Sequence, residues 1–173
     1  MISQNKGKMY FTTRELVFTA LMTAFVFTAT YLPHIPIPLG YAHLGDAVIF
    51  LLALMAGRRV TFFAACVGSV LADLLGGFVL WALPTLIIKF VMAEIVFRIA
   101  RRRDSLAGRR NIIAALVLSS LWMAAAYTLA GAVLYDSLTA ALASSPGLLM
   151  EGLVNGVIAL LLLPLLREHF PRR

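Results

Sequence analysis

The stretch LPTLIIKFVMAEIVFRIA at residues 83–100 is a long apolar run. A short arginine-rich connection, RRRDSLAGRRN at residues 101–111, joins it to a second apolar run, IIAALVLSSLWMAAAYTLAGAVLY at residues 112–135. An α-helix rises about 1.5 Å per residue, so each run is close to or beyond the roughly 20 residues that cross a hydrocarbon layer of about 30 Å. The connection is strongly charged and too short to fold alone. This stretch predicts an all-α integral membrane protein.

The rest of the chain repeats this pattern of apolar runs and short connections. Its 173 residues are 61% hydrophobic with a mean hydropathy of +0.92, which is more apolar sequence than one soluble core of this size contains. We expect one transmembrane domain over residues 1–173, with a short cytoplasmic tail at 1–13. The six expected membrane-spanning helices cover residues 15–32, 44–57, 60–78, 83–100, 112–135 and 148–166.

The positive charges indicate how the chain is oriented. Every lysine and arginine except Lys89 lies before the first expected helix, between the second and third, in the last turn of the fourth or between it and the fifth, or after the sixth. The connections at 33–43, 76–82 and 136–147 contain none. Because cytoplasmic loops are enriched in Lys and Arg, both termini are predicted to be cytoplasmic, in the plasma membrane of a prokaryote. The pI of about 10.2 therefore reflects topology beside lipid, and we expect no nucleic-acid partner.

Ionisable side chains inside a membrane are costly and by default indicate function. Those of the expected helices gather in the outer half, where they form a cup open to the outside, and only Glu94 lies deeper. The inner half lacks the polar side chains that a path across the bilayer needs. The polar residues of this predicted cup are Asp46, Asp73, Lys89, Glu151 and Asn155.

Each of these residues also has a structural explanation. Lys89 could pair with Asp73 or Glu151 and hold helices together. Asp46 could be a helix N-terminal residue favoured by the helix dipole. Tyr41, Trp81, Tyr127 and Tyr135 could be aromatic residues of the membrane interface, although Tyr41 and Trp81 lie in the outer loops, where they could stack on a flat ligand.

Three motifs resemble those of a known family. They are His43-Leu44-Gly45-Asp46-Ala47, the segment GSVLADLLGG at 68–77 and the segment WALPTLIIK at 81–89. Their order and spacing are similar to those of substrate-binding S components of energy-coupling factor (ECF) vitamin importers. The match is best with the branch associated with riboflavin, hydroxymethylpyrimidine and vitamin B6, and it covers essentially the whole chain.

This resemblance implies a six-helix S component whose ligand lies beneath the loop at 33–43. The site residues it implies, together with the polar cup, are Tyr41, His43, Asp46, Asp73, Trp81, Lys89, Glu151 and Asn155. A compact ring with amine, hydroxyl or ring-nitrogen groups suits several carboxylates, so we expect the vitamin B6 group or hydroxymethylpyrimidine. Riboflavin is the alternative.

The resemblance also implies partners. S components dock on a transmembrane coupling protein through an Ala-x-x-x-Ala surface of the first helix, which Ala20 and Ala24 match, although ordinary internal packing would explain the same spacing. The chain has no phosphate-binding loop motif, so ATP hydrolysis would belong to two partner ATPase subunits. We expect no catalytic residues, metal or cofactor. A stand-alone secondary carrier is the remaining alternative, although no internal repeat is visible.

The charge distribution yields a first prediction, that both termini are cytoplasmic. In a Cys66→Ala background, single cysteines at Ser105 and Ser144 should be accessible from the inside and the outside, respectively. Accessibility labelling of intact cells measures this. Labelling of position 105 from outside would contradict the topology.

Overall fold

The computed structural model describes residues 11–33, 35–102 and 105–169, and these residues form an almost entirely helical bundle. The prediction of an all-α membrane protein with six helices is confirmed. The helices are α1 (Thr13–Tyr31), α2 (Gly45–Met55), α3 (Arg58–Leu75), α4 (Ala82–Ala100), α5 (Arg109–Leu134) and α6 (Leu138–His169). Two small hairpins, β1 (Ile35–Ile37) with β2 (Gly40–Ala42) and β3 (Arg101–Arg102) with β4 (Ser105–Leu106), and a 3₁₀ turn η1 (Val79–Trp81) complete the described part.

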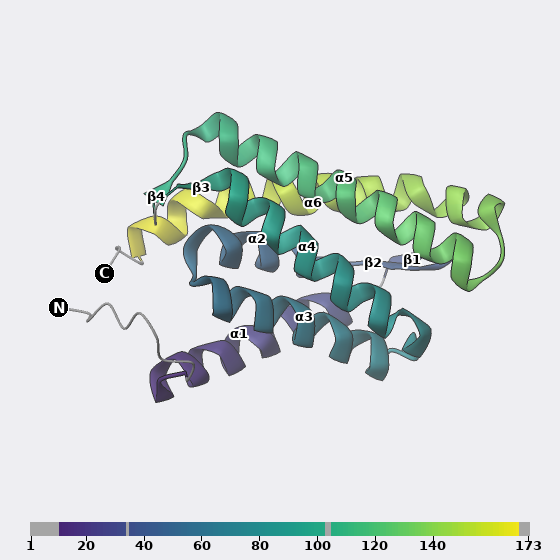
Figure 1. Cartoon of the computed structure of the whole chain (residues 1–173), viewed down its shortest axis with the longest axis horizontal. Helices are drawn as coiled ribbons and strands as arrows, with labels where there is room; N and C mark the ends of the chain where they lie inside the picture. The colour runs from purple at the N-terminus through teal and green to yellow at the C-terminus, as the bar shows by residue number, and fades with distance from the viewer. Residues whose placement is uncertain (1–10, 34, 103–104, 170–173) are drawn as a thin grey trace.

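The two ends of the bundle differ in charge. The start of α1, the end of α6 and the β3–β4 hairpin lie together at one end, while the β1–β2 hairpin and the α5–α6 turn lie toward the other (Figure 1). The arginines of the described helices and hairpins lie at the first end, including Arg14, Arg58 and Arg109. Lys6, Lys8, Arg103, Arg172 and Arg173 fall outside the described residues. The fold thus gathers the basic segments at the end predicted to be cytoplasmic.

Three helical segments are long and apolar enough to cross a membrane by themselves: Val79–Ala100, Arg109–Leu134 and Leu138–Arg167. Around them, large apolar side chains such as Leu21 of α1, Val133 of α5 and Leu161 of α6 are more than half exposed. A soluble protein would bury such side chains, whereas a lipid environment solvates them.

Helix α2 is shorter than the expected span at 44–57. Its 11 residues extend only about 16 Å, which is too short to cross the hydrocarbon layer. Nine of them are buried, and α2 packs against α1, α3, α4 and α6. The chain enters α2 from the β1–β2 hairpin, so α2 begins partway through the bundle, with its first turn deep in the protein, and ends close to Arg58 at the arginine-rich end.

Helix α6 begins ten residues earlier than expected, at Leu138 instead of Leu148, so the expected loop at 136–147 is wrong. Ser137 accepts a hydrogen bond from the Ala140 N–H at 3.3 Å, as a helix N-cap does. Pro146 cannot donate to the Leu142 carbonyl, but the Ser145 hydroxyl donates to it at 2.7 Å. The Ser-Ser-Pro-Gly stretch therefore stays helical because a serine replaces the missing backbone donor.

This correction affects the labelling test. Ser144 is only 3% exposed within α6, whereas Asp136 lies exposed in the α5–α6 turn. The extracellular cysteine therefore belongs at position 136.

Candidate ligand-binding site

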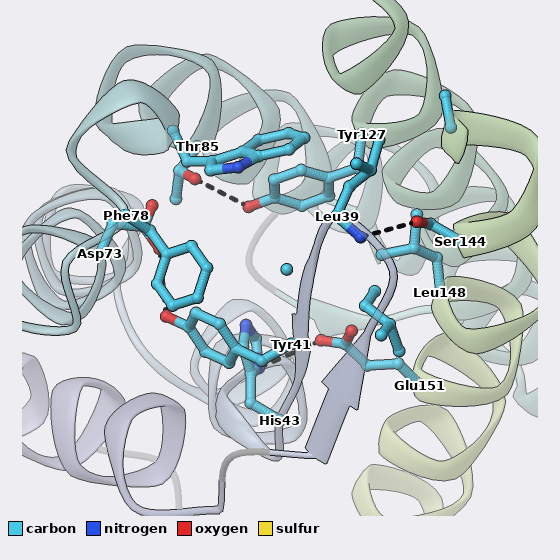
Figure 2. A pocket seen from close by; sticks show the side chains of 14 residues that line it. Leu39, Tyr41, His43, Asp73, Phe78, Thr85, Tyr127, Ser144, Leu148 and Glu151 are labelled. Carbon is cyan, nitrogen blue, oxygen red and sulfur yellow. Dashed lines mark hydrogen bonds and ion pairs between the residues drawn. The ribbon is translucent and has the colours of Figure 1, made fainter. Parts of the chain in front are cut away.

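A cavity lies beneath the β1–β2 hairpin, at the end of the bundle that lacks arginines. Its empty volume, counting the space open to solvent at the mouth, is about 510 Å³. Figure 2 shows side chains converging on it from the hairpin and from α3, α4, α5 and α6. The lining residues are Ile37, Leu39, Gly40, Tyr41, His43, Asp73, Phe78, Trp81, Thr85, Tyr127, Ala141, Ser144, Leu148 and Glu151.

The hairpin is seated on α6. The Leu39 N–H donates to the Ser144 Oγ at 3.0 Å, as Figure 2 shows. A Cβ atom at Gly147 would lie 2.6 Å from Ile37 Cγ2, so only glycine permits this close approach of the hairpin. The segment at 33–43, expected to be a loop above the ligand, contains a hairpin that covers the cavity and contacts α6. His34 falls outside the described residues.

Aromatic side chains form two sides of the cavity. The ring centroids of Trp81 and Tyr127 are 5.6 Å apart, and those of Tyr41 and Phe78 are 4.9 Å apart. Gly77, with a φ of +84°, turns the chain between α3 and η1 and so brings Phe78 and Trp81 to the cavity. At these separations the two rings of each pair contact each other, so each pair forms a continuous aromatic wall that can face a flat ligand.

The polar groups of the aromatic side chains are themselves bonded. Tyr127 donates its hydroxyl hydrogen to Thr85 Oγ1 at 3.1 Å, and Trp81 Nε1–H donates to the Tyr135 hydroxyl at 3.3 Å. Tyr41 donates to Asp73 Oδ1 at 3.1 Å. Burial and the Asp73 carboxylate raise the pKa of the Tyr41 phenol, so this residue remains a neutral donor.

Glu151 and His43 meet at the base of the cavity. The Glu151 Oε1 lies 3.1 Å from His43 Nδ1, and both side chains are buried. Asn155, one turn further along α6, donates to the carbonyls of His43 and Glu151 and accepts the Ala47 N–H at 2.9 Å. This amide therefore fixes the first turn of α2 to α6.

Beneath the cavity, Lys89 of α4 forms an ion pair with Asp46 of α2. The Nζ and Oδ1 atoms are 2.5 Å apart, and both side chains are fully buried. The predicted structural partners of Lys89, Asp73 and Glu151, are wrong: its carboxylate partner is Asp46. Lys89 Nζ also lies 5.3 Å from the ring centroid of Tyr127, so the ion pair supports the cavity wall from below.

The structure divides the eight predicted site residues into two layers. Those that line the cavity are Tyr41, His43, Asp73, Trp81 and Glu151. Asp46, Lys89 and Asn155 are fully buried in a layer below it. Glu94, the deeper acidic residue, pairs with Arg58 at 2.5 Å and Arg98 at 2.7 Å toward the arginine-rich end, away from the cavity.

Sequence reasoning missed nine of the 14 residues that line the cavity, and three of these bear on its chemistry. Tyr127 was predicted to be an interfacial aromatic residue, and Phe78 and Thr85 were not considered. Thr85 lies one turn before Lys89 on α4, and that spacing was the available signal. The predicted docking residues Ala20 and Ala24 are both exposed on α1, so neither is packed inside the bundle.

Comparisons with known proteins bear on this cavity. A family model described as "ECF-type riboflavin transporter, S component" matches residues 10–168. The chain is also 39% identical over 112 residues to an uncharacterized protein encoded in a "gap 3'region" of Pyrococcus woesei, an alignment that covers 64% of this chain and 73% of the relative.

A second prediction concerns the buried ion pair. Lys89→Met should lower the stability of the ligand-free protein by about 3–5 kcal/mol, because Asp46 is left charged and buried without its partner. Adding Asp46→Asn should recover part of the loss. Thermal unfolding in detergent measures both variants. If Lys89 only contacted the ligand, Lys89→Met would leave the melting temperature of the ligand-free protein unchanged. An unchanged melting temperature would therefore contradict the structural role.

Proposed function

Because this chain belongs to the family of ECF-type riboflavin transporter S components, we propose that its cavity captures a compact nitrogen-containing aromatic vitamin from outside the cell. Family membership makes the chain a membrane-embedded substrate-binding subunit of a vitamin importer and not an enzyme. The ligands that we favour are the vitamin B6 group and hydroxymethylpyrimidine.

The observation that carries this choice is the combination of aromatic walls with two carboxylates in one small cavity. Asp73 and Glu151 both line it, and ionised carboxylates only accept hydrogen bonds. They therefore suit a ligand that carries several donors, such as hydroxyl, amine or protonated ring-nitrogen groups, around one ring. A flavin has three fused rings and offers more carbonyl acceptors than donors on its polar edge.

We assign different roles to the two layers of the site. Trp81 and Tyr127 on one side, and Tyr41 on the other, would stack on the ring. Asp73 and Glu151 would accept hydrogen bonds from its substituents. Asp46, Lys89 and Asn155 would act through these residues, since all three are buried beneath the cavity and their printed contacts hold its base in place.

Riboflavin is the second candidate, because the matching family model carries that vitamin in its description. The aromatic walls formed by Trp81, Tyr127, Tyr41 and Phe78 would also accept a flavin ring. A stand-alone carrier is the less favoured mechanism. The polar cluster lies entirely toward the hairpin end, so the described residues supply no polar route through the inner half of the bundle.

Transport then requires partners that this chain does not contain. We propose a transmembrane coupling protein docked on α1 and two ATPase subunits that supply the energy. Ala20 and Ala24 lie one helical turn apart and are exposed, among large apolar neighbours such as Leu21. Small side chains in this arrangement let another helix approach closely within lipid.

A third prediction tests the ligand. Among pyridoxine, hydroxymethylpyrimidine and riboflavin, one of the first two should bind the purified protein most tightly. Trp81→Ala should weaken that binding by ten- to a hundredfold, corresponding to about 1–3 kcal/mol of lost stacking and packing. Titration calorimetry in detergent measures the affinities. The matched control is Leu80→Ala. Leu80 precedes Trp81 in the chain, and its side chain is 62% exposed on the outer surface of the bundle.

Tightest binding by riboflavin would reject the favoured ligands and support the second candidate. Unchanged affinity in Trp81→Ala would reject the stacking role.

A fourth prediction tests the docking surface. Ala20→Leu or Ala24→Leu should abolish uptake in cells that contain the coupling proteins, while the purified variants bind ligand normally. The larger side chain would hold the partner helix away from α1. The matched control is Ala125→Leu on the exposed face of α5. Normal uptake by both α1 variants would mean that these alanines face only lipid.

A further inference from the structure

The nitrogen atom His43 Nδ1 is approached by two groups at once. The Gly45 backbone N–H points at it, with an N–N distance of 3.2 Å, and Glu151 Oε1 lies 3.1 Å away. A peptide N–H is always a donor, so Nδ1 accepts this bond and carries no hydrogen of its own. The imidazole is therefore neutral, with its single hydrogen on Nε2.

A neutral His43 places a requirement on Glu151. An ionised carboxylate oxygen beside a bare nitrogen lone pair would bring two acceptors together without a hydrogen between them. A protonated Glu151 removes this conflict, because its O–H then shares the Nδ1 lone pair with the Gly45 N–H. The geometry of the empty cavity is therefore that of a carboxylic acid hydrogen-bonded to a neutral histidine.

The surrounding charges favour the same state. Among the described side chains at the base of the cavity, the positive charge is that of Lys89, and its ammonium group is already bonded to Asp46 at 2.5 Å. One ammonium group cannot neutralise two buried carboxylates, and an uncompensated buried charge is costly. Asp46 Oδ2 is also buried without a hydrogen-bond partner among the described residues, so its negative charge is incompletely screened.

Resting on the proposed function, we infer that the base of this cavity holds one exchangeable positive charge: a proton on Glu151 when empty, and a cationic nitrogen of the ligand when occupied. Binding of a cationic ligand releases the Glu151 proton to solvent. The carboxylate exchanges its bond to His43 Nδ1 for an ion pair with the incoming nitrogen, and Nδ1 keeps the bond from the Gly45 N–H. The site thus prefers vitamin forms that carry a protonated amine over otherwise identical forms with a hydroxyl group.

Other titratable groups around Glu151 do not supply the exchanged proton. Lys89 and Asp46 remain locked in their own pair beneath the cavity, and Tyr41 of β2 remains protonated because burial and Asp73 oppose its ionisation. Tyr127 of α5 is bonded to Thr85, and Asp73 of α3 accepts a hydrogen bond from Tyr41. Glu151 is the acid that lines the cavity and also lies, together with the Gly45 N–H, against the lone pair of His43 Nδ1.

An inorganic cation is the other possible source of positive charge, since His43, Asp46 and Glu151 offer ligand atoms within 4.8 Å of one another. The Lys89 ammonium group already bonded to Asp46 opposes a second cation at that carboxylate. A ligand ammonium group approaching Glu151 from the cavity does not meet this obstacle.

The test compares pyridoxamine with pyridoxine, which share one ring and differ by an aminomethyl in place of a hydroxymethyl group. Calorimetry between pH 6.0 and 7.5, in buffers of different ionisation enthalpy, counts protons released on binding. We expect pyridoxamine to release about one proton and its affinity to rise by up to about tenfold per pH unit, because it competes with a proton. Pyridoxine should release none and show an affinity that changes less than about twofold.

Glu151→Gln is the informative variant, because the Gln amide can still donate to His43 Nδ1 and mimics the protonated acid. It should abolish both the proton release and the pH dependence for pyridoxamine. Asp136→Asn, which changes an exposed carboxylate at the same end of the bundle, is the matched control and should alter neither. The proton count on the unmodified chain tests the inference even if Glu151→Gln fails to fold.

Several results would overturn the inference. Equal proton counts for the two ligands would do so, as would pH dependence that survives in Glu151→Gln. Proton release caused by Na⁺ or Mg²⁺ alone, with none caused by pyridoxamine, would assign the charge to an inorganic ion. If neither B6 form binds while riboflavin does, the exchange is rejected although the chain still functions as a vitamin-binding subunit. If pyridoxamine binds without releasing a proton, the exchange is rejected and the proposed function stands. If none of these vitamins binds, the proposed function itself fails.

Discussion

The ion pair between Lys89 and Asp46 is the interaction on which the rest of the site depends. Two opposite charges at 2.5 Å, both fully buried, must stay together, because separating them would leave each charge in a medium that cannot solvate it. The pair joins α4 to the first turn of α2. Asn155 then joins that same turn to α6 through the Ala47 N–H and the His43 carbonyl. The short helix α2 is thereby held from two sides.

This fixation explains how an 11-residue helix is useful in a membrane protein. Helix α2 does not need to cross the bilayer, because α1, α3, α4 and α6 surround it and shield its backbone from lipid. Its buried start leaves space above it that the β1–β2 hairpin covers. The hairpin in turn contacts α6 at Ser144 and Gly147, which exist at that position only because α6 continues through Pro146. Cavity floor and cavity cover thus depend on the same two helices.

The uneven distribution of polar groups suits a binding subunit that needs partners. Buried ionisable side chains are concentrated near the hairpin end, whereas toward the arginine-rich end the described acidic residue Glu94 lies in a partly exposed network with Arg58 and Arg98. A ligand held at the hairpin end therefore has no polar path onward within the described bundle. This one-sided arrangement is in keeping with the family to which the chain belongs, whose members are substrate-binding subunits of vitamin importers.

The sequence by itself determined the membrane class, the number of helices and the end at which the basic segments gather, because hydrophobic length and loop charge act locally and need no knowledge of packing. It also selected Tyr41, Asp73, Trp81 and Glu151, since polar or aromatic residues near the ends of apolar runs stand out, whereas His43 was implied by the resemblance to the family. Only the tertiary structure decided that Lys89 pairs with Asp46, 43 positions away, and that Tyr127 faces the cavity rather than the membrane interface. Those outcomes depend on how each helix is rotated and placed against its neighbours. The start of α6 was likewise hidden, because a side-chain hydrogen bond from Ser145 offsets the proline that would otherwise mark a loop.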